Sequence, residues 1–188
     1  LDQSMVQGIY AEWLAFFQTE AKHQYLTDPA THDGYFPPSV SEIAKNNTQR
    51  DLKEFFHIYS WGRYPREVSD AATRYFQQGS ALAQTLLNWV EEHSPADVKA
   101  RYTVPLPSML EGSDHTLLRV LHYPPLRGDE EPGAVRAAAH GDINLLTILP
   151  AATEPGLQVL GKEGAWHDVP CDFGLLIVNI GDMLEEAS

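Results

Sequence analysis

The tripeptide His140-Gly141-Asp142 is the strongest candidate for chemistry in this sequence. It follows residues 134–139, a short run that we predict to be a strand. In extended backbone, residues two apart point to the same side, so an imidazole nitrogen and a carboxylate oxygen can bind one ion together. They would supply two ligands of a facial site of two histidines and one carboxylate, which leaves further metal positions open.

The pattern His-x-Asp is weak evidence by itself, because it occurs often by chance. The plain alternative is that His140 and Asp142 are exposed polar residues at a strand end. A zinc-type hydrolase built on the same pair is a further alternative. It is disfavoured because no third nitrogen or sulfur ligand and no candidate base appears nearby in the sequence. The pair therefore has to be judged together with the sequence around it.

Two regions with different hydrophobic periods must position the tripeptide. Up to about residue 110, apolar residues recur at spacings of three and four, which predicts helices over residues 2–20 and 68–90. After about residue 115 the period falls towards two, which predicts strands over residues 116–123, 134–139, 145–149, 157–160, 166–169 and 175–179. We therefore expect one structural unit with a helix-rich region, 1–110, and a strand-rich region, 111–188, folded as an antiparallel sandwich or roll.

Composition narrows the function classes. The chain of 188 residues has 26 acidic and 13 basic side chains, and its formal net charge of −13 disfavours binding to nucleic acid or to anionic membranes. No segment approaches the roughly 18 consecutive apolar residues of a membrane span. Cys171 is the single cysteine, so no internal disulfide can form, which is typical of a reducing compartment. We therefore expect a cytoplasmic protein that binds neither nucleic acid nor membranes.

Five short motifs follow one another in the second half of the chain. They cover residues 118–125, 138–149, 156–159, 166–169 and 178–184. Together they resemble the isopenicillin N synthase-like branch of the iron(II)/2-oxoglutarate-dependent dioxygenases. The front half is similar as well, through Lys22, Tyr25 and residues 34–35 and 51–56. The resemblance therefore covers nearly the whole chain, and five ordered motifs are far more specific than any one of them.

This resemblance implies a mainly β fold with α, in which a jelly-roll (double-stranded β-helix) core follows an N-terminal helical region. It implies Fe(II) as the metal, 2-oxoglutarate as the cosubstrate, consumption of O2, and oxidation or hydroxylation of a small-molecule substrate. By position, His140 and Asp142 match the family's first two metal ligands. Tyr123 matches a tyrosine that in relatives can hydrogen-bond the cosubstrate. The region over residues 111–188 would then be a partial jelly-roll catalytic core.

The sequence also departs from the family pattern. In the family a second metal-binding histidine and an Arg-x-Ser motif follow the segment that matches residues 178–184, and this sequence ends at Ser188 before either. The third ligand is thus absent from this chain, and we expect the jelly-roll to be incomplete at the C-terminus. Leu121 stands where relatives often carry asparagine. A second hypothesis follows, a truncated and catalytically inactive jelly-roll that acts as a binding or oligomerisation module and forms a homodimer through uncovered sheet surface.

Several polar residues near these motifs are expected to be structural. If Tyr123 faces the pocket, His122 points to the opposite side of the same strand. His57 and His167 are expected to pack rather than to bind a metal. Asp182 stands before a short helical pattern, so we expect it to cap a helical turn.

Overall fold

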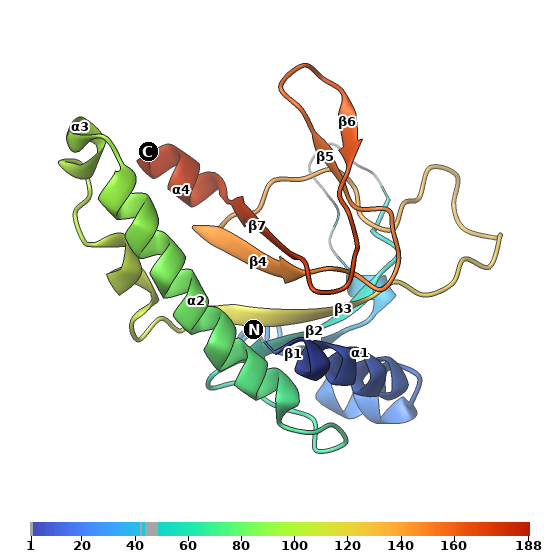
Figure 1. The fold of residues 1–188 in the computed structure, drawn as a ribbon. Coiled ribbons are helices and arrows are strands. Elements are labelled where there is room, and N and C mark those ends of the chain that lie inside the picture. The colour runs from blue at the N-terminus through green and yellow to red at the C-terminus, as the bar shows by residue number, and fades with distance from the viewer. Residues whose placement is uncertain (1, 42, 44–48) are drawn as a thin grey trace.

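Two helices flank the strands of the molecule, in a computed structural model that describes residues 2–41, 43 and 49–188. Helix α1 (Gln3–Phe17) begins at Asp2, whose carboxylate accepts the backbone N–H groups of Ser4 and Met5. Helix α2 (Ala71–His93), green in Figure 1, runs along one side of the molecule. Both match the two helices predicted from the 3.6-residue period. No helix of the described residues is long and apolar enough to cross a membrane.

Within the described residues, seven strands form three small antiparallel sheets, which Figure 1 shows beside α2. Strand β2 (Glu54–Tyr59) lies between β1 (Gly34–Phe36) and β3 (Leu117–His122). A second sheet pairs β4 (Leu146–Pro150) with β7 (Leu176–Ile180), and β5 (Gln158–Leu160) with β6 (Trp166–Asp168) forms a projecting hairpin. The remaining elements are η1 (Glu20–Tyr25), η2 (Pro38–Val40), α3 (Ala96–Lys99), η3 (Leu106–Leu110) and α4 (Asp182–Ala187).

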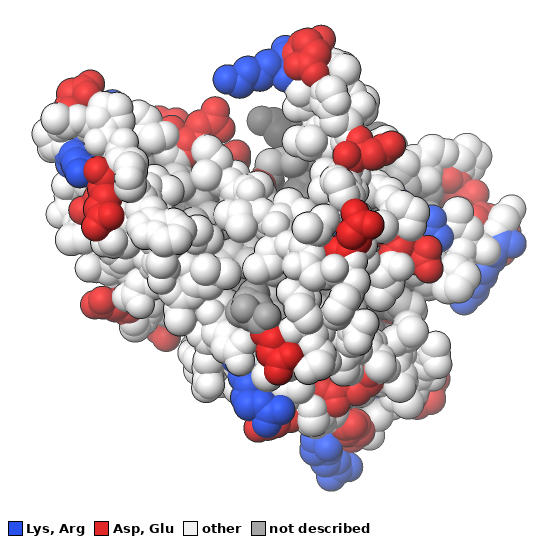
Figure 2. Space-filling view, in the orientation of Figure 1, with Lys and Arg blue, Asp and Glu red and all other residues white. Residues whose placement is uncertain are grey.

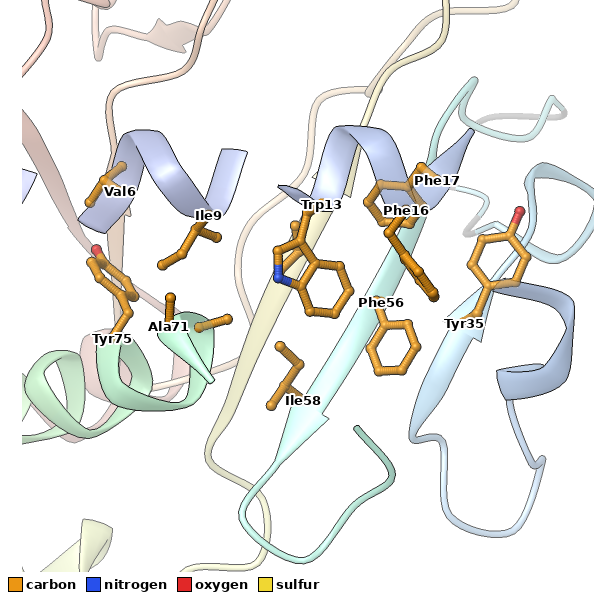
Figure 3. Close-up of a cluster of buried hydrophobic side chains, with 12 residues drawn as sticks. Val6, Ile9, Trp13, Phe16, Phe17, Tyr35, Phe56, Ile58, Ala71 and Tyr75 are labelled. Atoms are coloured by element: carbon orange, nitrogen blue, oxygen red, sulfur yellow. The ribbon is translucent and has the colours of Figure 1, made fainter. Parts of the chain in front are cut away.

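The main core lies between α1, α2 and one face of β2. Trp13 and Phe16 of α1 point towards Phe56 of β2, and all three side chains are at most 3% exposed (Figure 3). Their rings meet edge to face, with the centroids of Trp13 and Phe56 5.2 Å apart. Edge-to-face packing is a favoured arrangement for aromatic rings and adds to the effect of burying them. The N-terminal helix is thus fixed directly to the strand that pairs with β3.

The predicted strands of the second half are confirmed at five of six places. The exception is the predicted strand at residues 134–139, which is wrong because this segment is irregular. Its contacts with neighbouring backbone are isolated, such as the bond from the Leu52 N–H to the Val135 carbonyl at 2.9 Å, and they form no ladder. A strand needs a partner along its length, and alanine-rich sequence has little tendency to pack as one.

The hydrophobic period of the front half, which predicts helices, gives no sign of strand β2. All its residues except Tyr59 are buried, on both faces, so its sequence does not alternate between apolar and polar side chains. Its pairing with β3 joins the two regions divided at residue 110, in the register that sets Glu54 opposite His122 and Tyr59 opposite Leu117. The division of the chain at residue 110 stays a prediction.

Charged side chains are spread over the surface. Figure 2 shows acidic groups scattered over one face, with lysine and arginine at its margins rather than gathered in a patch. This distribution agrees with the net charge of −13 and offers no basic surface on the face shown.

A buried carboxylate joins the helical part to the sheet. Glu54, 4% exposed, is bonded to Lys22 at 2.8 Å and to the ring nitrogen Nδ1 of His122 at 2.7 Å, and it accepts the hydroxyl of Tyr35. Burial by itself would raise the pKa of Glu54, but the hydrogen bonds from its three partners outweigh burial and lower it. The carboxylate therefore stabilises the fold in its ionised form.

Replacing Glu54 by glutamine tests this cluster. Above its ordinary pKa of 4.5 the carboxylate contributes fully, and the contribution is lost as the pH falls through the lower pKa of the folded state. We expect Glu54→Gln to lower the free energy of unfolding by about 1.5–3 kcal/mol at neutral pH. The difference in free energy of unfolding between the variant and wild type should become smaller at acid pH, as measured by denaturant unfolding at several pH values. A gap that is constant with pH would contradict the assignment, and Glu163→Gln, on an exposed carboxylate, should change little.

Candidate metal centre

His140 and Asp142 lie in the connection between β3 and β4, a few residues before β4 begins. The imidazole Nε2 of His140 is 3.8 Å from the carboxylate Oδ1 of Asp142. Metal–ligand bonds to nitrogen and oxygen are about 2.0–2.2 Å long, so two ligand atoms of one ion are about 3.0 Å apart at right angles and up to about 4.3 Å apart on opposite sides. The side chains are 51% and 31% exposed, which leaves the space around them open to further ligands. The spacing therefore allows both atoms to bind one ion.

The ring of His140 is held in a defined orientation. Its Nδ1 is 2.7 Å from the carbonyl oxygen of Ala138. A carbonyl oxygen only accepts hydrogen bonds, so Nδ1 carries the proton of this contact. In the neutral ring the lone pair is then on Nε2, the nitrogen that faces Asp142. A hydrogen bond of this kind to the distant ring nitrogen is the usual support of a histidine that binds a metal.

Asp142 is supported through its other oxygen. Its Oδ2 accepts the hydroxyl of Thr147 at 2.6 Å and the amide Nδ2 of Asn179 at 2.9 Å. Thr147 and Asn179 are directly opposite each other in the register of β4 and β7. Burial would raise the pKa of Asp142, but these two hydrogen bonds, assisted by His140 and Arg119, lower it overall. The ionised carboxylate therefore keeps Oδ1 directed towards His140.

The loop after Asp142 is fastened to the start of α4. The N–H of Asp182 donates to the carbonyl of Asp142 at 2.8 Å, and the N–H of Gly181 donates to the carbonyl of Leu145 at 3.1 Å. A β-carbon at Gly181 would overlap both the carbonyl and the side-chain oxygen of Asn144 and would be 2.7 Å from the carbonyl of Asp142. A residue without a side chain is required at position 181 for the backbones to approach this closely.

The prediction that Asp182 caps a helical turn is wrong by one residue. The residue before the helix is Gly181, and no side chain caps it, whereas Asp182 is the first helical residue. The close backbone approach explains the difference, because the Asp182 N–H is directed at Asp142. The carboxylate of Asp182 turns back towards Gly141, where an added β-carbon would be 2.9 Å from its Oδ1.

The structure brings His140 and Asp142 together and gives contacts to the three histidines that were expected to be structural. His122 binds Glu54 and His57 accepts the Nε–H of Arg119 at 2.9 Å, while His167 pairs with Glu163 in the hairpin. Tyr123 follows β3 directly and is 39% exposed. Its role as a cosubstrate contact stays a prediction.

Thr147 and Asn179 were not singled out from the sequence, although each is the one side chain in an otherwise apolar strand that can donate hydrogen bonds. A single polar side chain in an apolar strand needs a hydrogen-bond partner, so each of these two residues could have been predicted to have one. What the sequence could not show was that the two strands pair in the register that aims both groups at Asp142.

The two ligand side chains present, an imidazole and a carboxylate, are of the types that bind iron. One imidazole and one carboxylate are two of the three ligands of the facial site expected from the sequence. Among residues 2–41, 43 and 49–188, no third histidine, cysteine, aspartate or glutamate joins them to form a cluster.

Comparisons with known proteins agree with this chemistry. The model of the 2OG-Fe(II) oxygenase superfamily matches residues 114–188, which include both candidate ligands. The chain is 54% identical in sequence to a candidate oxygenase from Shewanella oneidensis. The crystal structure of that protein superimposes with a TM-score of 0.87, over 100% of this chain and 67% of the Shewanella chain. The chain belongs to the 2OG-Fe(II) oxygenase superfamily. The expected jelly-roll fold class is thereby confirmed, as are Fe(II) and 2-oxoglutarate as the cofactors of the family.

Two further members of the superfamily are similar over most of this chain. A candidate 2OG-Fe(II) oxygenase family protein from Caulobacter crescentus is 30% identical with a TM-score of 0.73, over 98% of this chain and 63% of its own. A 2-oxoglutarate-Fe(II) type oxidoreductase of Metarhizium rileyi is 31% identical over 183 residues, 90% of this chain and 46% of its own length. The chain thus spans about half of this curated relative and about two thirds of the solved structures.

The close backbone approach at Gly181 can be tested by adding a methyl group. We expect Gly181→Ala to lower the free energy of unfolding by about 1–3 kcal/mol, because the loop of Asp142 and Asn144 must move to make room. The backbone φ of Gly181 is −101°, which alanine also adopts, so the effect is steric. Gly79→Ala is the control, since nothing lies within 4 Å of its β-carbon position in α2. It should stabilise by about 0.5–1 kcal/mol. Equal effects of the two variants in denaturant unfolding would contradict the contact.

Proposed function

We propose that the protein is a non-haem iron(II), 2-oxoglutarate-dependent dioxygenase that oxidises a small molecule, with His140 and Asp142 as two of its metal ligands. The observation that supports this most directly is the 3.8 Å separation of Nε2 and Oδ1, each on a side chain whose other polar atom is already hydrogen-bonded. Such a pair is oriented for binding one ion, because each side chain is already held through its other polar atom. The shared family and its cofactors support the same conclusion.

The residues of the site have separate tasks in this proposal. His140 supplies a neutral nitrogen donor, since its Nδ1 proton is held by the Ala138 carbonyl. Asp142 supplies negative charge, which Thr147 and Asn179 stabilise through the second oxygen. When bound, ferrous iron would supply activation of O2, coupled to conversion of 2-oxoglutarate to succinate and CO2 and to oxidation of the substrate.

Tyr123 is the residue of this chain that we propose for contact with the cosubstrate. Its phenolic hydroxyl can donate a hydrogen bond to a carboxylate oxygen of 2-oxoglutarate. The side chain lies directly after β3 and is partly exposed. The neighbouring His122 is bound to Glu54, which fixes the strand end from which Tyr123 extends.

The proposed ligands can be tested by release of succinate from 2-oxoglutarate, measured on the natural polypeptide that carries this sequence. We expect the release to require ferrous iron and to be abolished in both His140→Ala and Asp142→Ala, since each removes one ligand. The matched control is His167→Ala, because His167 also pairs with a carboxylate, that of Glu163, but lies in the β5–β6 hairpin. Unchanged turnover in the two ligand variants would overturn the assignment.

A second candidate function is an inactive jelly-roll that acts as a binding or assembly module. It is favoured by the apolar side chains that the last third of the chain exposes. Examples are Val159, Trp166, Phe173 and Ile180, each more than half exposed. Contiguous exposed apolar surface marks protein interfaces.

This second candidate predicts a homodimer. Two copies that cover the apolar surface of β5, β6 and β7 should give twice the chain mass of 21.0 kDa in light scattering at micromolar concentration. Trp166→Lys should shift the population towards the monomer, because a charge replaces an apolar side chain that the association would bury. A single monomeric mass at all concentrations would count against the module.

A further inference from the structure

A buried ion pair contacts the segment that leads to the candidate metal centre. Asp51 and Lys53 are both 3% exposed, and the Nζ of Lys53 is 2.9 Å from the Oδ2 of Asp51. They precede β2, on the side of the strand opposite the aromatic core, and Lys53 also lies 5.8 Å from the ring centroid of Phe55. A buried pair of this kind contributes little net stability, because desolvation offsets much of the attraction. We therefore looked for a role of this ion pair other than stabilising the fold.

The second oxygen of Asp51 reaches the segment that carries the histidine. Asp51 Oδ1 accepts the backbone N–H of Ala138 at 3.0 Å, across 87 residues of sequence. The carbonyl of the same residue accepts the Nδ1 proton of His140 at 2.7 Å. Hydrogen bonds thus connect Lys53 to Asp51 and Asp51 to the N–H of Ala138, and the covalent backbone of Ala138 leads on to the carbonyl that binds the imidazole.

The surroundings of Asp51 hold it firmly. Its own carbonyl accepts the hydroxyl of Ser41 at 2.7 Å, and the N–H of Leu52 donates to the carbonyl of Val135 at 2.9 Å. Residues 134–139 form no strand, so their position depends on contacts of this kind rather than on a ladder. The carboxylate of Asp51 is therefore well placed to fix the backbone from which His140 extends.

We propose that Asp51 is a positioning residue for His140, with Lys53 fixing its carboxylate. Asp51 holds the N–H of Ala138 and so anchors the backbone of this residue, whose carbonyl holds the Nδ1 proton of His140 and leaves Nε2 free for the metal. This inference rests on the proposed function of His140 as an iron ligand. The hydrogen bond from Ala138 to Asp51 comes from the front half of the chain, so the sequence motif around His140 does not include it.

The test compares two equally buried aspartates. Asp51→Ala removes the contact with Ala138, and Asp33→Ala is the control, because Asp33 is 4% exposed and is bound to Arg63 away from residues 134–142. Both variants remove one partner of an ion pair, so both should lose stability. Only Asp51→Ala should affect His140.

The first measurement is the tautomer of His140 in the metal-free protein, read from the imidazole nitrogen shifts by NMR. We expect the Nδ1-protonated form in wild type and Asp33→Ala, and a mixture of tautomers in Asp51→Ala. The second measurement is the affinity for Co(II), a spectroscopic substitute for Fe(II), followed by its visible absorption. Loss of such a support typically costs about 10–100-fold in metal affinity, which we expect for Asp51→Ala alone.

The outcomes separate this inference from the proposed function. If wild type shows no Co(II) affinity that depends on His140, the proposed function fails, and the tautomer measurement still decides the role of Asp51. If Asp51→Ala keeps both the tautomer and the affinity of wild type, the inference is overturned. Asp51→Asn keeps an oxygen for the Ala138 N–H, so it should retain more affinity than Asp51→Ala. Equal losses in the two variants would show that this hydrogen bond does not position the histidine.

Discussion

Burial of β2 on both faces is the constraint on which the rest of the structure depends. One face sets Phe56 and Ile58 against the aromatic residues of α1, and the other sets Phe55 against Phe36 and the guanidinium of Arg119. Polar groups in such a strand have no access to water, so each must find a partner inside the protein. Glu54 and His57 do so through Lys22, His122, Arg119 and the carbonyl of His32. These contacts tie the first sixty residues to β3.

The candidate centre is built from two kinds of support. The histidine depends on a backbone carbonyl within two residues of it, whereas the aspartate depends on Thr147 and Asn179, which come from two paired strands. The short loop between them is held by Gly181 and the start of α4. Each ligand is thus fixed by a different part of the fold, and the 3.8 Å between them reflects how β4, β7 and the preceding loop fit together.

Local sequence was enough to predict that His140 and Asp142 lie close together, and it predicted most of the strands after residue 115, because spacing and hydrophobic period are properties of neighbouring residues. Their role as metal ligands stays a prediction. Local sequence failed for β2, because burial on both faces removes the alternation of apolar and polar side chains. It also failed at residues 134–139, where an alanine-rich segment has no partner strand. The contacts of Thr147 and Asn179 with Asp142 could not be predicted from local sequence, because they depend on the register of β4 and β7, which pairs residues 32 positions apart. Asp51 is further still from Ala138, and a distant side chain that meets a backbone N–H leaves no pattern in either segment.

The contact between Asp51 and Ala138 also has a consequence for the order of folding. It closes a loop of 87 residues, while Asp142 and Asn179 are separated by 37. Loop closure of this length costs chain entropy before it returns any contact energy, so such pairings slow folding and form after local structure. The histidine and the aspartate are two residues apart in sequence, yet we expect their relative geometry to form late in folding, because it depends on these long-range contacts.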